Sequence, residues 1–107
     1  MEKRIKLEIK PYEINVDGKK IPFLVKDSLA TLLFNPALKL NATQVRKNDK
    51  IARKLEDCQD DFVLLLPDEM VVIREAIAAF DGFDRNAIEL LDRIDRVEEV
   101  DVEVKEK

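Results

Sequence analysis

The chain has 107 residues, of which 46% are hydrophobic and 39% are charged, and its formal net charge is −4. This length fits a single domain over residues 1–107, and the supply of apolar side chains excludes a disordered tail. With no Trp, one Tyr and five Phe, the core is expected to be aliphatic.

An N-terminal β-hairpin is predicted over about residues 4–25. Apolar and polar residues alternate on both sides of Pro11, but the phase shifts by one residue there, so Pro11 is expected to mark a bulge. Asp17-Gly18 is a favoured pair for a type I′ turn, because both central residues of that turn need positive φ. Pro22 indicates a sheet edge. The register set by the turn gathers the apolar residues on one face: Tyr12, Ile14, Val16, Ile21, Phe23 and Val25.

Three or four helices follow, with a short strand between the second and third. The predicted helices cover about residues 28–34, 42–57, 68–80 and 85–95, and the strand covers about 62–66. Asp27 or Ser28 is expected to cap the first helix, and Asn41 with Gln44 is expected to form a capping box at the second. Pro67 is a favourable first residue for the third helix.

Apolar residues recur at helical spacing and define the faces expected to point inward. These are Val45, Ile51, Ala52, Leu55 and Cys58 in the second helix, Met70, Ile73, Ala76, Ile77 and Phe80 in the third, and Ile88, Leu91 and Ile94 in the last. Gly82 is expected to end the third helix as its C′ residue. Strict alternation predicts a final strand at about residues 100–104, returning beside the hairpin in a small sheet. The fold class is therefore α+β.

The residue inventory argues against catalysis. The chain has no histidine, and its two glycines cannot supply a glycine-rich phosphate-binding loop. Cys58 stands among Asp57, Asp60 and Asp61, whose negative charge raises a thiol pKa, so a packing role is expected. The acidic residues lack the spacing of a calcium-binding loop and are explained by helix caps and a solvated face. We expect no enzyme activity, no metal and no cofactor.

The expected location is the cytoplasm. A single cysteine cannot form an internal disulfide, the N-terminus lacks the apolar stretch of a signal peptide, and no apolar run approaches the ~20 residues that span a bilayer. Asn41-Ala42-Thr43 matches a glycosylation sequon, but without a secretory route Asn41 is better explained as a helix cap.

Charge is divided between the two halves of the chain. Residues 1–54 hold 13 Lys/Arg and 6 Asp/Glu, a net of +7, whereas residues 55–107 hold 6 and 17, a net of −11. The densest basic cluster, in the second predicted helix, is Arg46, Lys47, Lys50, Arg53 and Lys54. Steps of three and four residues place all of these except Lys47 within about a third of the helix circumference. Three interpretations stay open: a solvated polar face, docking on an acidic surface of a partner or another copy, and contact with nucleic-acid phosphates.

The segment Asp27–Leu40, followed by a basic helix containing Lys50–Leu55, resembles small accessory proteins encoded among the structural and assembly genes of tailed bacteriophages and prophages. The resemblance implies a virion component or assembly factor, located in the host cytoplasm or the virion. We therefore expect a non-enzymatic interaction or assembly module that binds a protein partner or itself, without a small-molecule substrate or a membrane. The alternative is a nucleic-acid-binding regulator that uses the helix at 42–57.

Overall fold

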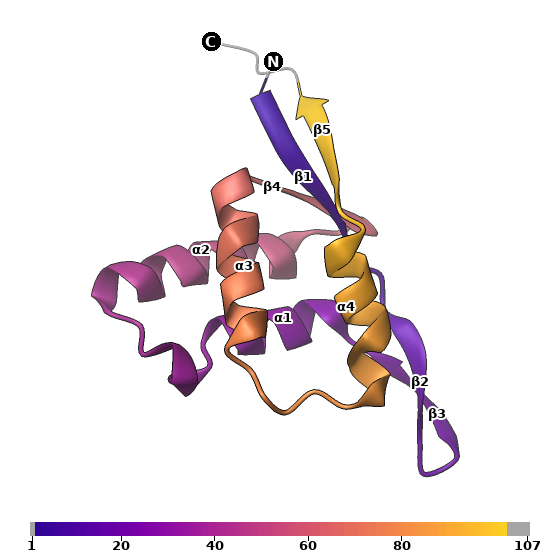
Figure 1. Cartoon of the computed structure of the whole chain (residues 1–107). Coiled ribbons are helices and arrows are strands. Elements are labelled where there is room, and N and C mark those ends of the chain that lie inside the picture. The colour runs from indigo at the N-terminus through magenta and orange to yellow at the C-terminus, as the bar shows by residue number, and fades with distance from the viewer. Residues whose placement is uncertain (1, 103–107) are drawn as a thin grey trace.

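The computed structural model describes residues 2–102 and has an α+β fold. Its elements are β1 (Glu2–Glu8), β2 (Tyr12–Val16), β3 (Lys19–Phe23), α1 (Val25–Leu33), the 3₁₀ turn η1 (Pro36–Leu38), α2 (Ala42–Asp57), β4 (Phe62–Leu65), α3 (Pro67–Ala78), the 3₁₀ turn η2 (Arg85–Ala87), α4 (Ile88–Asp95) and β5 (Glu98–Val102). Two β ladders project from opposite ends of a helical body, giving extents of 53 × 30 × 22 Å (Figure 1). Over residues 2–102, none of the helices has the length and apolar character needed to cross a bilayer.

The strands form two small antiparallel sheets. β1 is the central strand of the first sheet, in the order β4-β1-β5, and β2 and β3 form the second. The C-terminal strand predicted at 100–104 is β5, which pairs with β1 so that Glu2 lies opposite Val102. The last two residues of that prediction, 103 and 104, lie outside the described residues.

Pro11 separates the two sheets in place of the expected bulge. Residues 9–11 belong to no strand, although the Ile9 N–H donates to the Asp61 carbonyl at 2.7 Å and so continues the β1–β4 register by one residue pair. Pro11 itself has no N–H to donate. The chain therefore leaves the first sheet after β1 and begins the second at Tyr12, so the predicted first strand of the hairpin is divided between β1 and β2.

The β2–β3 hairpin has the predicted register, with Ile14 opposite Ile21. Its turn residues Asp17 and Gly18 have φ of +52° and +78°, as a type I′ turn requires. Within the described part of the chain, no atom lies within 4 Å of the place where a Cβ on Gly18 would stand. Glycine is favoured there by its backbone conformation and not by lack of space.

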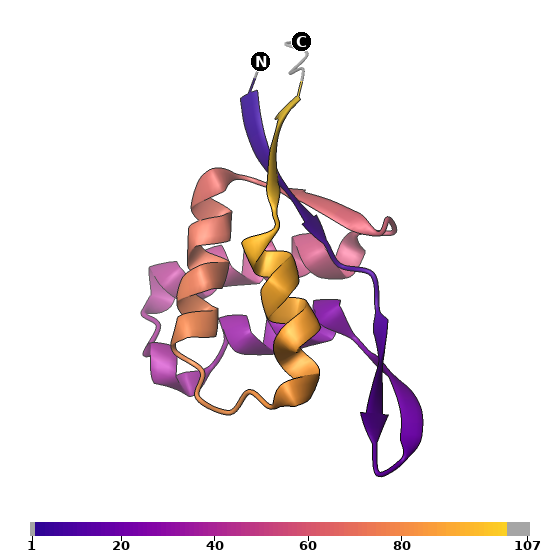
Figure 2. The ribbon, with the colours of Figure 1, turned by 45° about the vertical axis from the view of Figure 1, so that its right-hand side comes forward.

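The core is aliphatic, as the composition predicts. α1 packs against α2 and α3, while α3 and α4 lie side by side and contact β1 (Figure 2). The largest fully buried side chains are Leu7, Ile9, Val25, Leu29, Leu33, Ile51, Leu55, Leu65, Ile73 and Leu90. None of the five phenylalanines belongs to this buried set.

The helix ends agree with the sequence patterns in part. The capping box is confirmed, since the Gln44 N–H donates to Asn41 Oδ1 at 2.9 Å and the Asn41 N–H donates to Gln44 Oε1 at 3.0 Å. Pro67 opens α3 as predicted. The expected cap at Asp27 or Ser28 is wrong, because α1 begins earlier, at the fully buried Val25, and Asp27 lies within its first turn.

Two inward faces differ from the prediction. Val45 is exposed, and the buried polar residue of that turn of α2 is Asn48, whose Nδ2 donates to the Leu33 carbonyl at 2.7 Å. The helix expected at 85–95 divides into η2 and α4, and Leu90 is buried whereas Ile88 is 52% exposed. A 3₁₀ turn winds more tightly than an α-helix, so it shifts the register in which the next turns face the core.

Gly82 does not end α3, which stops at Ala78 with Ala79 as its C-cap. A Cβ at position 82 would lie 2.7 Å from Cζ of Phe80. Gly82 therefore allows the Phe80 ring to fold back over the backbone.

Candidate interaction surfaces

The predicted basic cluster is divided between two sides of α2. Lys54 Nζ lies 2.7 Å from Glu69 Oε1, and Lys47 Nζ lies 3.3 Å from Asp68 Oδ2. Both acids belong to the first turn of α3, where carboxylates also favour the positive end of the helix dipole. These two lysines therefore connect α2 to α3.

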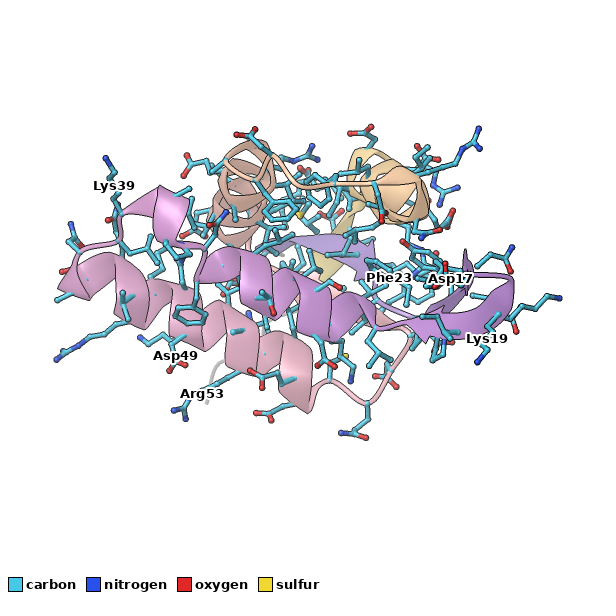
Figure 3. The ribbon with its side chains drawn as sticks, turned by 90° about the horizontal axis from the view of Figure 1, so that it is seen from below. Asp17, Lys19, Phe23, Lys39, Asp49 and Arg53 are labelled. Carbon is cyan, nitrogen blue, oxygen red and sulfur yellow. The ribbon has the colours of Figure 1, made fainter. Side chains whose placement is uncertain are left out.

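The other three basic residues face solvent. Arg53 Nε pairs with Asp49 Oδ2 at 2.9 Å, one helical turn away, and Figure 3 shows both side chains projecting from the same side of α2. Arg46 and Lys50 are exposed and form no ion pair within residues 2–102. We call Arg46, Lys50 and Arg53 the outer face of α2.

The charge division along the sequence does not become two separate patches, because ion pairs join the two halves. Besides the pairs between α2 and α3, Lys3 Nζ lies 3.3 Å from Glu99 Oε1 and 3.2 Å from Asp101 Oδ1. The hydrogen bonds to Asp101 and Glu99 raise the pKa of Lys3. Basic residues of the first half are thus neutralised in part by acids of the second.

Among the charged residues that the structure describes, Arg93 is the most deeply buried, with its side chain 6% exposed. Its Nε lies 3.1 Å from Glu89 Oε1 and 3.5 Å from Glu8 Oε1, and an Nη donates to the Lys10 carbonyl. The guanidinium also lies over the Tyr12 ring, 5.0 Å from its centroid. Arg93 therefore holds the junction between the two sheets against α4.

The polar groups around Arg93 have hydrogen-bond partners, and the pKa shifts of Tyr12 and Glu89 follow from their surroundings. Burial raises the pKa of Tyr12, whose hydroxyl donates to the Asn86 carbonyl at 2.8 Å. Burial acts to raise the pKa of Glu89, but hydrogen bonds from Arg93 and Arg96 outweigh it and lower that pKa below its ordinary value. No buried side-chain N or O within residues 2–102 lacks a hydrogen-bond partner. This cluster is accounted for by structural contacts.

The molecule has an apolar groove along α1, between α2 and the chain that follows α3. One part has a volume of about 600 Å³ and an adjoining part about 240 Å³, and the two share Thr31, Leu32 and Phe80. Four of the five phenylalanines line the groove: Phe23, Phe34, Phe80 and Phe83. We call this surface the aromatic groove.

Three of the four phenylalanine rings in the aromatic groove contact another aromatic ring. Phe80 and Phe83 pack edge to face with their centroids 4.7 Å apart, and Phe23 stacks on Tyr12 at 4.8 Å. Phe34 is 41% exposed. These geometries are the favourable ones for aromatic pairs, so they stabilise the positions of Phe23, Phe80 and Phe83.

The charged residues that line the groove are both acidic. Glu56 lines the larger part and Asp84 the smaller, and no Lys or Arg among residues 2–102 lines either. Neither acid forms an ion pair within residues 2–102. Asp81, which is exposed, lies between two residues that line the groove.

Sequence reasoning missed this groove. The sequence pattern places Phe80 on the inward face of the third helix and Phe23 on the apolar face of the hairpin. It predicts no role for Phe34 or Phe83. The available signal was position: Phe34 precedes Asn35-Pro36, and Phe80 and Phe83 flank Asp81-Gly82. Aromatic residues at helix ends, in a chain with an aliphatic core, are candidates for a surface site.

Cys58 is half-buried, and its Sγ lies 3.3 Å from the Phe62 carbonyl oxygen. In the part of the chain that the structure describes, no group of three or more His, Cys, Asp or Glu side chains is arranged to hold a metal ion.

Comparison of the chain with models of protein families, with curated proteins and with solved structures finds no match.

Proposed function

We propose that the chain is a non-enzymatic protein-binding module whose main contact surface is the aromatic groove. The observation that carries this proposal is that four of the five phenylalanines line one groove while the core is aliphatic. Aromatic side chains are enriched at the centres of protein interfaces, where a few of them supply most of the binding energy. A concave surface with aromatic walls suits apolar side chains of another polypeptide.

The polar groups of the groove support binding over catalysis. Asn35 Oδ1 accepts from the Ala37 N–H, and Asp84 Oδ1 accepts from the Asn86 N–H, at 3.1 and 2.9 Å. The Thr31 hydroxyl donates to a backbone carbonyl one turn earlier at 2.9 Å. These three groups are engaged in local structure, which favours a structural role for them over nucleophilic catalysis.

The outer face of α2 is a proposed second contact, for an acidic protein surface. Nucleic-acid binding by α2 is less well supported, because Lys47 and Lys54 are held by acids of α3 and Arg53 is held by Asp49. A cation that is already paired within the chain contributes less binding free energy when it contacts a phosphate.

Virion or prophage assembly is the setting we propose for this binding. It rests on the likeness of Asp27–Leu40 and Lys50–Leu55 to accessory proteins of tailed phages. The first of these segments contains Thr31, Leu32 and Phe34, which line the aromatic groove.

Site-specific photo-crosslinking in the source cell tests the proposal. A photoreactive phenylalanine analogue replaces Phe34 in the groove, and the same analogue replaces Val71, which is 52% exposed on α3 and does not line the groove. We expect a discrete crosslinked protein from position 34 and none of the same mass from position 71. No crosslink from position 34, or identical crosslinks from both positions, would contradict the proposal.

A further inference from the structure

The hairpin tip, defined as Val16 to Ile21, exposes apolar side chains that its own chain leaves uncovered. Val16 and Ile21 are 39% and 40% exposed, although both belong to the apolar face of the hairpin. At the base of the hairpin this face ends in the stacked and half-buried rings of Tyr12 and Phe23, but the tip projects beyond the body (Figures 1 and 3). β2 and β3 pair only with each other within residues 2–102.

The hairpin tip and the aromatic groove have complementary chemistry. Lys19 and Lys20 are exposed in the tip and form no ion pair within the described residues, and the only acid between Val16 and Ile21 is Asp17. The groove is aromatic, and the described residues that line it include acids and no bases. The same chain therefore presents a convex apolar and basic element and a concave apolar and acidic one.

We propose that the hairpin tip of one copy occupies the aromatic groove of a second copy. This inference rests on the proposed function, because it takes the groove as a protein-binding surface and names its occupant. Val16 and Ile21 contact the phenylalanine rings, while Lys19, which shares their face of the hairpin, approaches the acids of the groove. Lys20 lies on the opposite face and adds to the positive charge of the tip. Because each copy has both a tip and a groove, two copies related by a two-fold axis cover both pairs of surfaces at once.

Sedimentation velocity on the purified chain, from micromolar to millimolar concentration, is the first test. We expect a species heavier than one chain whose fraction rises with concentration and falls, without disappearing, at high salt. Val16→Ser/Ile21→Ser is expected to weaken self-association by about tenfold or more, because the buried apolar area is lost. Val71→Ser, which removes an exposed apolar residue outside both surfaces, is the matched control and leaves association unchanged.

Charge reversal gives a test that does not depend on removing apolar residues. Lys19→Glu/Lys20→Glu makes both tip and groove acidic. Glu56→Lys/Asp81→Lys places positive charge in the groove and beside it while the tip stays basic; Asp84 is left unchanged because its Oδ1 accepts from the Asn86 N–H. Each variant alone is expected to associate less than the wild type. Mixed in equal amounts, the two are expected to recover association, since each tip then meets a groove of opposite charge. Circular dichroism and thermal melts check that each variant is folded.

A chain that stays monomeric at millimolar concentration would overturn the self-docking proposal, as would association that neither the tip nor the groove variants change. A crosslink from position 34 to a different protein, with no self-association, would leave the protein-binding function standing and remove only the second copy as its occupant. A monomer that also gives no crosslink from position 34 would remove both.

Discussion

Lys54 Nζ and the Leu66 N–H both contact the same oxygen, Oε1 of Glu69, at 2.7 and 2.8 Å. Glu69 is 8% exposed and lies in the first turn of α3, where its carboxylate caps the helix. Lys54 therefore connects the last turns of α2 to the start of α3. A residue predicted for partner binding holds two helices of its own chain together.

Lys54→Met is expected to lower the free energy of unfolding by about 1 kcal/mol, because a nearly buried carboxylate loses its cation while Lys54 is itself partly solvated. Lys50→Met is the matched control on the outer face of α2, and its expected change is within about 0.5 kcal/mol. Urea unfolding followed by circular dichroism measures both. Equal losses in the two variants would show that the contact between Lys54 and Glu69 contributes nothing specific.

Arg93 and Arg96 share one acceptor, Oε1 of Glu89, each at 3.1 Å, but differ in exposure. Arg93→Met is expected to cost about 2 kcal/mol, less than the loss of a fully buried ion pair because Glu8 and Glu89 are partly exposed. Arg96→Met removes an exposed arginine and is expected to cost about 0.5 kcal/mol. Chemical unfolding of the two variants gives the comparison, and a larger loss for Arg96→Met would contradict the structural role of Arg93.

The lowered pKa of Glu89 predicts a contribution to acid sensitivity. A carboxylate whose pKa is lower in the folded than in the unfolded chain stabilises the fold above its unfolded pKa, and this stability is lost as pH falls through the folded pKa. Glu89→Gln is therefore expected to be less stable than the wild type at neutral pH and to lose less stability on acidification. Glu75→Gln, at an exposed position of α3, is the control. The free energy of unfolding is measured against pH for the wild type and Glu89→Gln. Parallel curves between neutral and acidic pH would refute the predicted contribution of Glu89.

Local chemistry explains which parts of the fold could be predicted. The type I′ turn at Asp17-Gly18 and the period-two alternation fix the hairpin register together, and the capping box at Asn41 and Gln44 needs only residues three positions apart. The phase shift at Pro11 was visible in the sequence. Its outcome depended on Asp61, a residue distant in sequence that accepts from the Ile9 N–H.

The candidate surfaces depended still more on distant contacts. In α4, Ile88 and Leu90 both fit a helical stripe, and only the preceding 3₁₀ turn decides which is buried. The basic cluster was correctly placed on one helix, but the acids that neutralise Lys47 and Lys54 come from α3. The aromatic groove needs α1, α2 and the segment after α3 to meet, so periodicity in any one element could not show it.

The division of the basic cluster also predicts weak nucleic-acid binding. Arg46 and Lys50 are the members of the cluster without an ion pair within the described residues, and the affinity of a basic surface for DNA grows with the number of phosphates it neutralises. With about two phosphates neutralised, the slope of log affinity against log salt is expected to be near −2, and a mobility shift at physiological salt should show no retardation of DNA or RNA at about 50 μM protein.

Arg46→Glu/Lys50→Glu, with Lys19→Glu/Lys20→Glu as a control of equal charge change, distinguishes a specific α2 contact from general attraction. Retardation at low micromolar protein that the first pair abolishes and the second leaves intact would restore the nucleic-acid reading of α2, since it would mean that the ion pairs of Lys47, Arg53 and Lys54 open to bind phosphate.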